Sequence, residues 1–121
     1  MAKKIIIADD DAGILELFQI IFERAGYEVV PYLSGSELFE EHEVPAIYLL
    51  DKQLSGIDGL DICRHLKKQA ITGSIPVVLV SATPGIGQLA IEAGADGFIE
   101  KPFDIADLLR IVEKNIAKTT A

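Results

Sequence analysis

The chain is short, acidic and rich in apolar residues: it has 121 residues, a formal net charge of −8 and a 50% hydrophobic composition. This length supports one hydrophobic core and is too short for two ordinary domains, so we expect a single domain over residues 1–121. The negative charge argues against direct binding to nucleic acid, because phosphate backbones are bound by Lys and Arg.

The sequence also bears on where the chain acts. No apolar run approaches the roughly 20 residues that cross a bilayer, so we expect no contact with a membrane. The apolar stretch at the N-terminus ends at Asp9, too early for the core of about 7–15 residues in a secretory signal peptide. Cys63 is the only cysteine, so no disulfide can form within the chain. We expect a cytoplasmic location.

Five short apolar runs follow one another along the chain and are typical of β-strands. They span Lys4–Ala8, Glu28–Tyr32, Ala46–Leu50, Ile75–Val80 and Gly97–Ile99. The first, third and fourth runs are nearly continuous in Ile, Val and Leu, which predicts strands buried on both faces of a parallel sheet. The second and fifth runs alternate more, so we expect them nearer the edges.

The first two connections between these runs are predicted to be helical. After the first run, apolar residues recur at helical spacing at Ile14, Leu17, Phe18 and Ile21. Asp11 is the favoured N-cap of this helix and Gly26 its C-terminal stop. In the second connection, Ser34 is followed three residues later by Glu37, the pattern of a capping box. We expect a helix there, with His42 on its surface.

The third helix is predicted over Asp58–Gln69, with Asp58 as its N-cap. Its apolar stripe consists of Leu60, Cys63 and Leu66. This stripe places Cys63 in the core, and His65 is expected on the surface because no second metal ligand lies near it.

The fourth connection is unusual because Pro84, Gly85 and Gly87 all disfavour helix. The fourth helix is therefore predicted to start late, to be short or irregular, and to stop at Gly94. The fifth helix has Asp104 as a plausible N-cap. Its apolar stripe contains Ile105, Leu108, Leu109 and Val112.

Five strand–helix units with no repeat and no internal linker predict an α/β fold, a parallel sheet with helices on both faces. Right-handed crossovers favour a doubly wound, flavodoxin-like arrangement with strand order 2-1-3-4-5. In such folds, ligands bind beyond the carboxyl ends of the strands. The residue types at those ends are therefore informative about function.

Acidic, hydroxyl and amine side chains stand where the predicted strands end. Asp9 and Asp10 follow the first strand, Asp51 the third, Ser81 the fourth and Lys101 the fifth. Clustered carboxylates repel one another unless a cation is present, and Mg²⁺ with one or two carboxylates and phosphate oxygens is the usual solution. An Asp carboxylate can be the nucleophile in phosphoryl transfer, while a Lys and a hydroxyl neutralise or bind phosphoryl oxygens.

Several motifs in the same order resemble those of the response-regulator receiver family, over essentially the whole chain. They are Ile5-Ile6-Ile7-Ala8-Asp9-Asp10-Asp11, Leu49-Leu50-Asp51 followed by Gly56, Asp58 and Gly59, the pair Ser81-Ala82, and Gly94-Ala95-Asp96 through Lys101-Pro102-Phe103. Each motif is weak by itself. Four in register, each at a predicted strand end, are specific.

The resemblance implies a role for each of these residues. Asp51 accepts the phosphoryl group. Mg²⁺, or Mn²⁺ in its place, is held by Asp9, Asp10, Asp51 and the backbone carbonyl of Gln53. Ser81 and Lys101 hold phosphoryl oxygens, and Lys101-Pro102 is a cis peptide. Ser81 and Phe98 form the switch that reports phosphorylation.

The function implied is a phosphoacceptor of a two-component phosphorelay. It is not an enzyme beyond its own phosphorylation and dephosphorylation. A histidine kinase or histidine phosphotransfer protein supplies the phosphoryl group. The face of the fourth helix, fifth strand and fifth helix then regulates a protein target or a fused output domain.

The chain departs from the family pattern at two places. Ser55 stands where the family usually has Pro, so the turn after Asp51 is expected to be less rigid. The segment Thr83–Gly87 belongs to a connection that is slightly shorter than usual, so the output face is expected to be unusual.

Two other functions fit parts of the sequence. A haloacid-dehalogenase-type phosphatase would use Asp9 as its nucleophile, with Asp11, Ser81 and Lys101 beside it, but it leaves Asp51 without a role. A phosphorylation-independent interaction module of the same fold would not need the acids, the hydroxyl or the lysine. In the simplest reading of single residues, Asp11 only caps a helix and Phe98 only packs.

Overall fold

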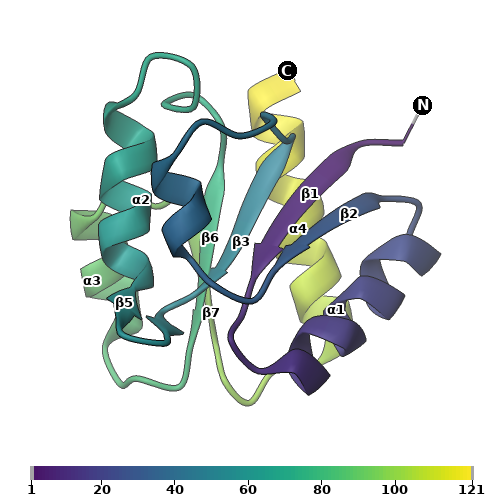
Figure 1. The fold of residues 1–121 in the computed structure, drawn as a ribbon. Coiled ribbons are helices and arrows are strands. Elements are labelled where there is room, and N and C mark those ends of the chain that lie inside the picture. The colour runs from purple at the N-terminus through teal and green to yellow at the C-terminus, as the bar shows by residue number, and fades with distance from the viewer. Residues whose placement is uncertain (1, 121) are drawn as a thin grey trace.

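The computed structural model describes residues 2–120, and the side chains of residues 2–118. Its centre is a parallel sheet of five strands in the order β2-β1-β3-β6-β7 (Figure 1). These strands are β1 (Lys4–Ala8), β2 (Glu28–Tyr32), β3 (Ile47–Asp51), β6 (Val77–Ser81) and β7 (Gly97–Glu100). Counted along the chain without the small hairpin described below, this is the order 2-1-3-4-5, and the predicted doubly wound fold is confirmed.

Four α-helices cover the two faces of the sheet. They are α1 (Ala12–Arg24), α2 (Gly59–Lys68), α3 (Ile86–Glu92) and α4 (Ile105–Thr120). Helices α1 and α4 pack on one face, whereas α2 and α3 pack on the other (Figure 1). Within residues 2–120, no helix combines the length and the apolar character needed to cross a membrane.

The central strands are buried on both sides, as their continuous apolar sequences predict. In β1, Ile5 and Ile7 face the α1–α4 layer, while Ile6 and Ala8 face the α2–α3 layer. Every residue of β3 and β6 is buried. The edge strands are more exposed, and β2 contains Pro31, which has no amide hydrogen to donate.

The helix ends follow the predicted caps. Asp11 accepts hydrogen bonds from the amides of Gly13 and Ile14 at 2.9 and 3.1 Å. Asp58 accepts one from the Leu60 amide, and Asp104 accepts one from the Asp107 amide. At the other ends of α1 and α3, Gly26 and Gly94 have φ angles of 97° and 85°, which favour glycine.

The predicted second helix is wrong. The connection from β2 to β3 contains only a 3-10 turn, η1 (Ser36–Phe39), and then extended chain. The Ser34 hydroxyl accepts from the Ser36 amide instead of capping at Glu37. Glutamates at positions 37, 40 and 41 would repel one another at helical spacing. Pro45 also disfavours a helical residue before it.

The histidines are also less exposed than predicted. His42 lies outside any helix, and its Nε2 is 2.6 Å from the hydroxyl of buried Tyr48. Because a carbonyl oxygen only accepts, His42 Nδ1 donates to the Glu40 carbonyl at 2.8 Å. His65 is half-buried, with its ring 5.1 Å from that of Phe39. Both histidines are thus packed residues.

Helix α3 is short, as predicted, and begins only at Ile86. Its N-cap is Gly85, which adopts a left-handed conformation with φ 77° and supplies no side-chain cap. Cys63, on the core-facing side of α2, is fully buried, again as predicted.

Candidate functional site

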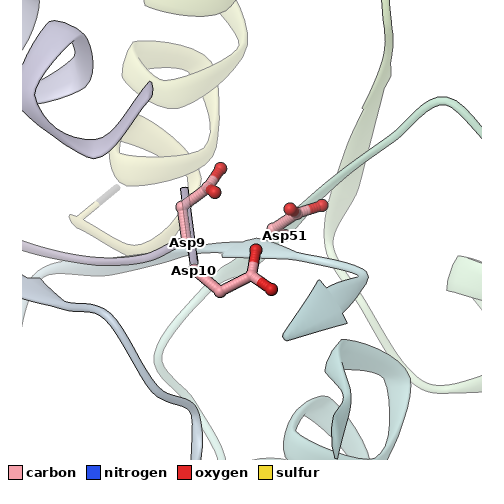
Figure 2. A group of neighbouring side chains, drawn as sticks. All are labelled: Asp9, Asp10 and Asp51. Carbon is pink, nitrogen blue, oxygen red and sulfur yellow. The ribbon is translucent and has the colours of Figure 1, made fainter. Parts of the chain in front are cut away.

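The predicted acidic residues meet at the carboxyl end of the sheet. Asp9 and Asp10 leave β1 and Asp51 ends β3, and each offers an oxygen within 4.8 Å of the others (Figure 2). The two strands are direct neighbours, since Ala8 pairs with Leu50 in register. The adjacency of β1 and β3 therefore brings together residues that lie more than 40 positions apart.

Asp9 is the most buried member of this cluster, with 1% of its surface exposed. Its Oδ1 accepts a 2.9 Å hydrogen bond from the Asp11 amide, but its Oδ2 is buried with no hydrogen-bond partner among the described residues. Burial, reinforced by the charge of Asp51, raises the pKa of Asp9 to about 6. A buried oxygen without a donor beside two more carboxylates is the arrangement that a bound cation would complete.

Asp51 is also buried, but unlike Asp9 it has a cationic side chain close by. Lys101 Nζ lies 3.9 Å from Asp51 Oδ2, and the Gln53 amide donates to Oδ1 at 3.5 Å. The pKa of Asp51 is raised, because burial outweighs the opposing effect of Lys101. At 3.9 Å the two charges attract each other, but the distance is too long for a hydrogen bond.

Asp10 is the exposed member of the cluster and is tied to Ser55, a residue that the sequence motifs did not place in the site. Its Oδ2 accepts two hydrogen bonds of 3.0 Å from Ser55, one from the amide and one from the hydroxyl. Ser55 lies in the turn between β4 (Gln53–Leu54) and β5 (Ile57–Asp58), a hairpin directly after Asp51. Nothing in the sequence near Ser55 signals this contact, which depends on the path of the hairpin.

Gly59, at the start of α2, fixes the backbone next to Asp51. A Cβ at Gly59 would lie 2.4 Å from the Asp51 carbonyl oxygen and 3.0 Å from Lys52 Cα. The Gly59 amide also donates to the Lys52 carbonyl at 2.7 Å. The glycine of the sequence motif is therefore required by close backbone contact.

Ser81 and Lys101 approach the cluster from β6 and β7. Asp51 pairs with Val80, so Ser81 is the next residue of the neighbouring strand, and the Lys101 amide donates to the Ser81 carbonyl at 2.9 Å. The Ser81 hydroxyl accepts from the Thr83 amide at 2.8 Å, which leaves its own proton for another acceptor. The peptide bond between Lys101 and Pro102 is cis, as predicted.

Gln53 touches this cluster through its backbone amide, which donates to Asp51, whereas Phe98 lies outside it. The side chain of Gln53 is exposed, and its backbone belongs to β4. Phe98 lies on β7 with 36% of its surface exposed, and its ring carbons come within 2.9–3.3 Å of where a Cβ on Gly87 would stand. Phe98 thus contacts α3 at a position where the helix has no side chain.

A separate hollow lies between η1 and α2. It has a volume of about 230 Å³ and is lined by Phe39, His42, His65 and a mixture of apolar and polar neighbours. A phosphoryl group and a cation need an open rim of charged groups, so we assign the candidate site from the carboxylates, Ser81 and Lys101.

Comparisons with known proteins agree with this geometry. Residues 5–113 match the family model of the response regulator receiver domain. The structure is similar to that of a putative response regulator from Chloroflexus aurantiacus, with a TM-score of 0.89 and 29% identity, covering 97% of this chain and 99% of the other.

Two receiver domains of histidine kinases are also similar in structure. One comes from Syntrophus aciditrophicus, with a TM-score of 0.87 and 30% identity, covering 97% of this chain and 92% of that one. The other, from Pseudomonas aeruginosa, has a TM-score of 0.88 and 22% identity, covering 97% and 99%. That domain has a magnesium ion coordinated in its active site cleft.

Proposed function

The chain belongs to the family of response regulator receiver domains, and we propose that it is a phosphoacceptor switch of a two-component phosphorelay, with Asp51 as the acceptor. The observation that carries the proposal is the position of Asp51, between the acids of β1 and the amine of Lys101. A phosphoryl group on Asp51 would meet negative charge on one side only, where a cation can neutralise it.

The residues present fit a magnesium ion. Asp9, Asp10 and Asp51 would hold it, together with the backbone carbonyl of Gln53, and Mn²⁺ would suit the same oxygen ligands. The buried Oδ2 of Asp9, which has no hydrogen-bond partner within the described part of the chain, supports this assignment. A bound Mg²⁺ would neutralise the carboxylates and the phosphoryl oxygens during transfer.

The transfer itself forms one bond and breaks one. An oxygen of Asp51 attacks phosphorus, the P–N bond of a phosphohistidine breaks, and its electron pair stays on the imidazole nitrogen, which then takes up a proton. The product is an aspartyl phosphate. The signal ends by hydrolysis: a water oxygen attacks phosphorus, the bond between phosphorus and the Asp51 oxygen breaks, and inorganic phosphate and the Asp51 carboxylate result.

Ser81 and Lys101 would bind the new phosphoryl oxygens. Lys101 is 3.9 Å from Asp51 and would reach an oxygen that extends the Asp51 side chain. Movement of the Ser81 hydroxyl toward that oxygen would loosen its bond with the Thr83 amide, which begins the segment before α3. Phe98 would respond to that change, so the face formed by α3, β7 and α4 would be the signalling surface.

The partners follow from this chemistry. A histidine kinase or a histidine phosphotransfer protein would supply the phosphoryl group, and a protein target or an output domain would read the altered face. A cytoplasmic location, and the absence of direct nucleic-acid binding, are part of the same proposal.

Mapping the phosphorylated residue tests the proposal. We expect wild type to take up phosphate from a small phosphodonor such as acetyl phosphate with Mg²⁺, and Asp51→Asn to lose at least about 100-fold of that uptake. Asp9→Asn should be slower but still labelled on Asp51. Asp61→Asn, at an exposed site on α2, is the control.

Other outcomes would identify the alternatives. Label on Asp9 that survives Asp51→Asn would indicate the phosphatase. A wild type that takes up no phosphate from small donors or a phosphohistidine protein would indicate the interaction module.

Lys101 separates phosphate uptake from the response to it. We expect Lys101→Ala to retain part of the uptake, because Asp51 and the cation ligands remain, but to lose most of the shape change. Amide NMR shifts of α3 and β7 with beryllofluoride and Mg²⁺ measure that change, with exposed Lys68→Ala as the control. A full shift in Lys101→Ala would count against its role.

A further inference from the structure

We propose that Ser55 is a positioning residue that presents Asp10 to a bound cation through a single carboxylate oxygen, and that it thereby favours Mg²⁺ over Ca²⁺. The inference rests on the proposed function only in taking Asp10 as a cation ligand. Ser55 stands where the receiver family usually has Pro, which has neither an amide hydrogen nor a hydroxyl to donate.

The hairpin conformation points Ser55 at Asp10. Ser55 and Gly56 have φ angles of 43° and 86°, the left-handed pair expected of a two-residue type I′ turn. Ser55 is the one residue other than glycine with positive φ in the described chain, residues 2–120. Proline could not adopt this angle, because its ring holds φ near −65°.

Both donors of Ser55 bond the same oxygen of Asp10. The amide and the hydroxyl each lie 3.0 Å from Oδ2. One oxygen of Asp10 points toward the side chains of Asp9 and Asp51, and the other points away from them (Figure 2). With Oδ2 held by two donors, Oδ1 is the oxygen that Asp10 can offer to a cation.

The hairpin is anchored well enough to act as a tether. Lys52 Nζ lies 3.1 Å from Asp58 Oδ2, and Asp58 Oδ1 caps α2 at the Leu60 amide. The same segment begins at Asp51, whose carbonyl is in close contact with Gly59. Ser55 therefore connects Asp10, after β1, to the backbone that carries Asp51, after β3.

Binding through one oxygen distinguishes the two cations. Ca²⁺ takes six to eight oxygens and often binds a carboxylate through both of them, whereas Mg²⁺ requires a small octahedral shell. A carboxylate with one oxygen occupied by hydrogen bonds is a poor bidentate ligand and a well-oriented monodentate one. Partners of ligand residues commonly change metal affinity by about 10–100-fold.

Three substitutions separate the contributions of Ser55. Ser55→Ala removes the hydroxyl, Ser55→Gly removes it and relaxes the left-handed backbone, and Ser55→Pro removes both donors. Ser34→Ala is the matched control, because within residues 2–118 the hydrogen bonds of the Ser34 side chain join it to Ser36 in another turn. Mg²⁺ and Ca²⁺ affinities are measured separately by calorimetry and by amide NMR, without any phosphodonor.

We expect Ser55→Ala and Ser55→Gly to bind Mg²⁺ about 3–10-fold more weakly while Ca²⁺ binding changes by less than about twofold. The preference for Mg²⁺ should therefore fall by at least about threefold in both, and further in Ser55→Pro. If Ser55→Pro does not fold, the Ala and Gly variants decide the question together.

An unchanged ratio of the two affinities in Ser55→Ala and Ser55→Gly overturns the proposal, as does an increase in Mg²⁺ affinity. A change in Ser55→Ala that Ser55→Gly does not share would assign the effect to backbone strain, and it overturns the role of the hydroxyl. Because no phosphodonor is present, these results are independent of whether Asp51 is phosphorylated.

Discussion

Two regions of the molecule each contain a glycine with no room for a side chain. They are the site at the carboxyl end of the sheet and the face formed by α3 and β7, and they differ in which atoms would block an added Cβ. At Gly59 the obstacle is backbone, the carbonyl oxygen of Asp51 at 2.4 Å. At Gly87 it is the ring of Phe98 at 2.9 Å. A carbonyl in a strand cannot move aside, whereas a half-exposed ring can rotate. The position of the acidic site is thus fixed by backbone contacts, whereas the neighbouring face is packed by a side chain that can move.

The two regions also differ in polarity. The site contains Asp9 and Asp51, buried acids whose pKa values are raised above the ordinary value by their burial. The α3–β7 face carries exposed apolar residues, with Ile91 at 67% and Phe98 at 36% exposure. The buried carboxylate charges therefore lower the stability of the site, whereas the α3–β7 face offers exposed apolar surface for contact. Substitutions in each region should test this contrast.

The largest effect is expected at Gly59. Gly59→Ala would force Cβ against the Asp51 carbonyl, and we expect the free energy of unfolding to fall by about 3 kcal/mol, the upper end for overpacking. Urea denaturation measures it. Gly13→Ala, near the start of α1, is the control, since its Cβ would meet only the Asp11 side chain at 3.3 Å. Equal effects of the two substitutions would contradict a backbone obstacle.

A smaller effect, of opposite sign, is expected at Asp9. Its folded pKa of about 6 lies above the ordinary value of 3.8, so the folded state binds the proton more tightly than the unfolded state. The metal-free protein should therefore lose stability as pH rises from about 4 to 6, and the loss is complete above that range. Asp9→Asn should be more stable than wild type by about 2–3 kcal/mol at pH 7 and similar to it near pH 4.

Thermal or urea unfolding in EDTA at several pH values measures this difference. Addition of Mg²⁺ should stabilise wild type more than Asp9→Asn, since a ligand that binds only the folded state raises its stability. A wild type that becomes steadily more stable from pH 4 to pH 7 without metal would contradict the raised pKa.

The smallest change in stability is expected at Gly87. Gly87→Ala gains about 1 kcal/mol of helix propensity and loses a similar amount by displacing the Phe98 ring, so the net change should stay under about 1 kcal/mol. The ring itself should move, which nuclear Overhauser contacts between Phe98 and α3 would report. In a Phe98→Ala background the same substitution should simply stabilise, because the obstacle is gone. A ring that keeps its contacts in Gly87→Ala would show that this face is as rigid as the site.

The residues that could be predicted from the sequence are those fixed by strand order. Continuous apolar strands identify the sheet, and the ends of β1, β3, β6 and β7 then bring Asp9, Asp10, Asp51, Ser81 and Lys101 to one edge. The helix caps at Asp11, Asp58 and Asp104 were equally clear, because a single side chain bonds nearby amides.

The features that could not be predicted from the sequence depend on contacts between distant segments. The capping-box pattern at Ser34 predicted a helix, but charge repulsion among glutamates and the contact of His42 with Tyr48 favour extended chain. Ser55 could not be placed, because its bonds to Asp10 span 45 positions and depend on a left-handed turn. Local patterns identify helices and caps, but a tether between two loops appears only in three dimensions.

The edges of the sheet have a consequence for how the protein behaves at high concentration. Exposed edge strands can template pairing between molecules, which leads to aggregation. Here β2 has lost one donor at Pro31 and begins with a charged residue, Glu28, while β7 has only four residues and ends in exposed Glu100. Both edges are thus poor templates, which favours a sheet that ends at five strands and molecules that remain separate until a partner meets another surface.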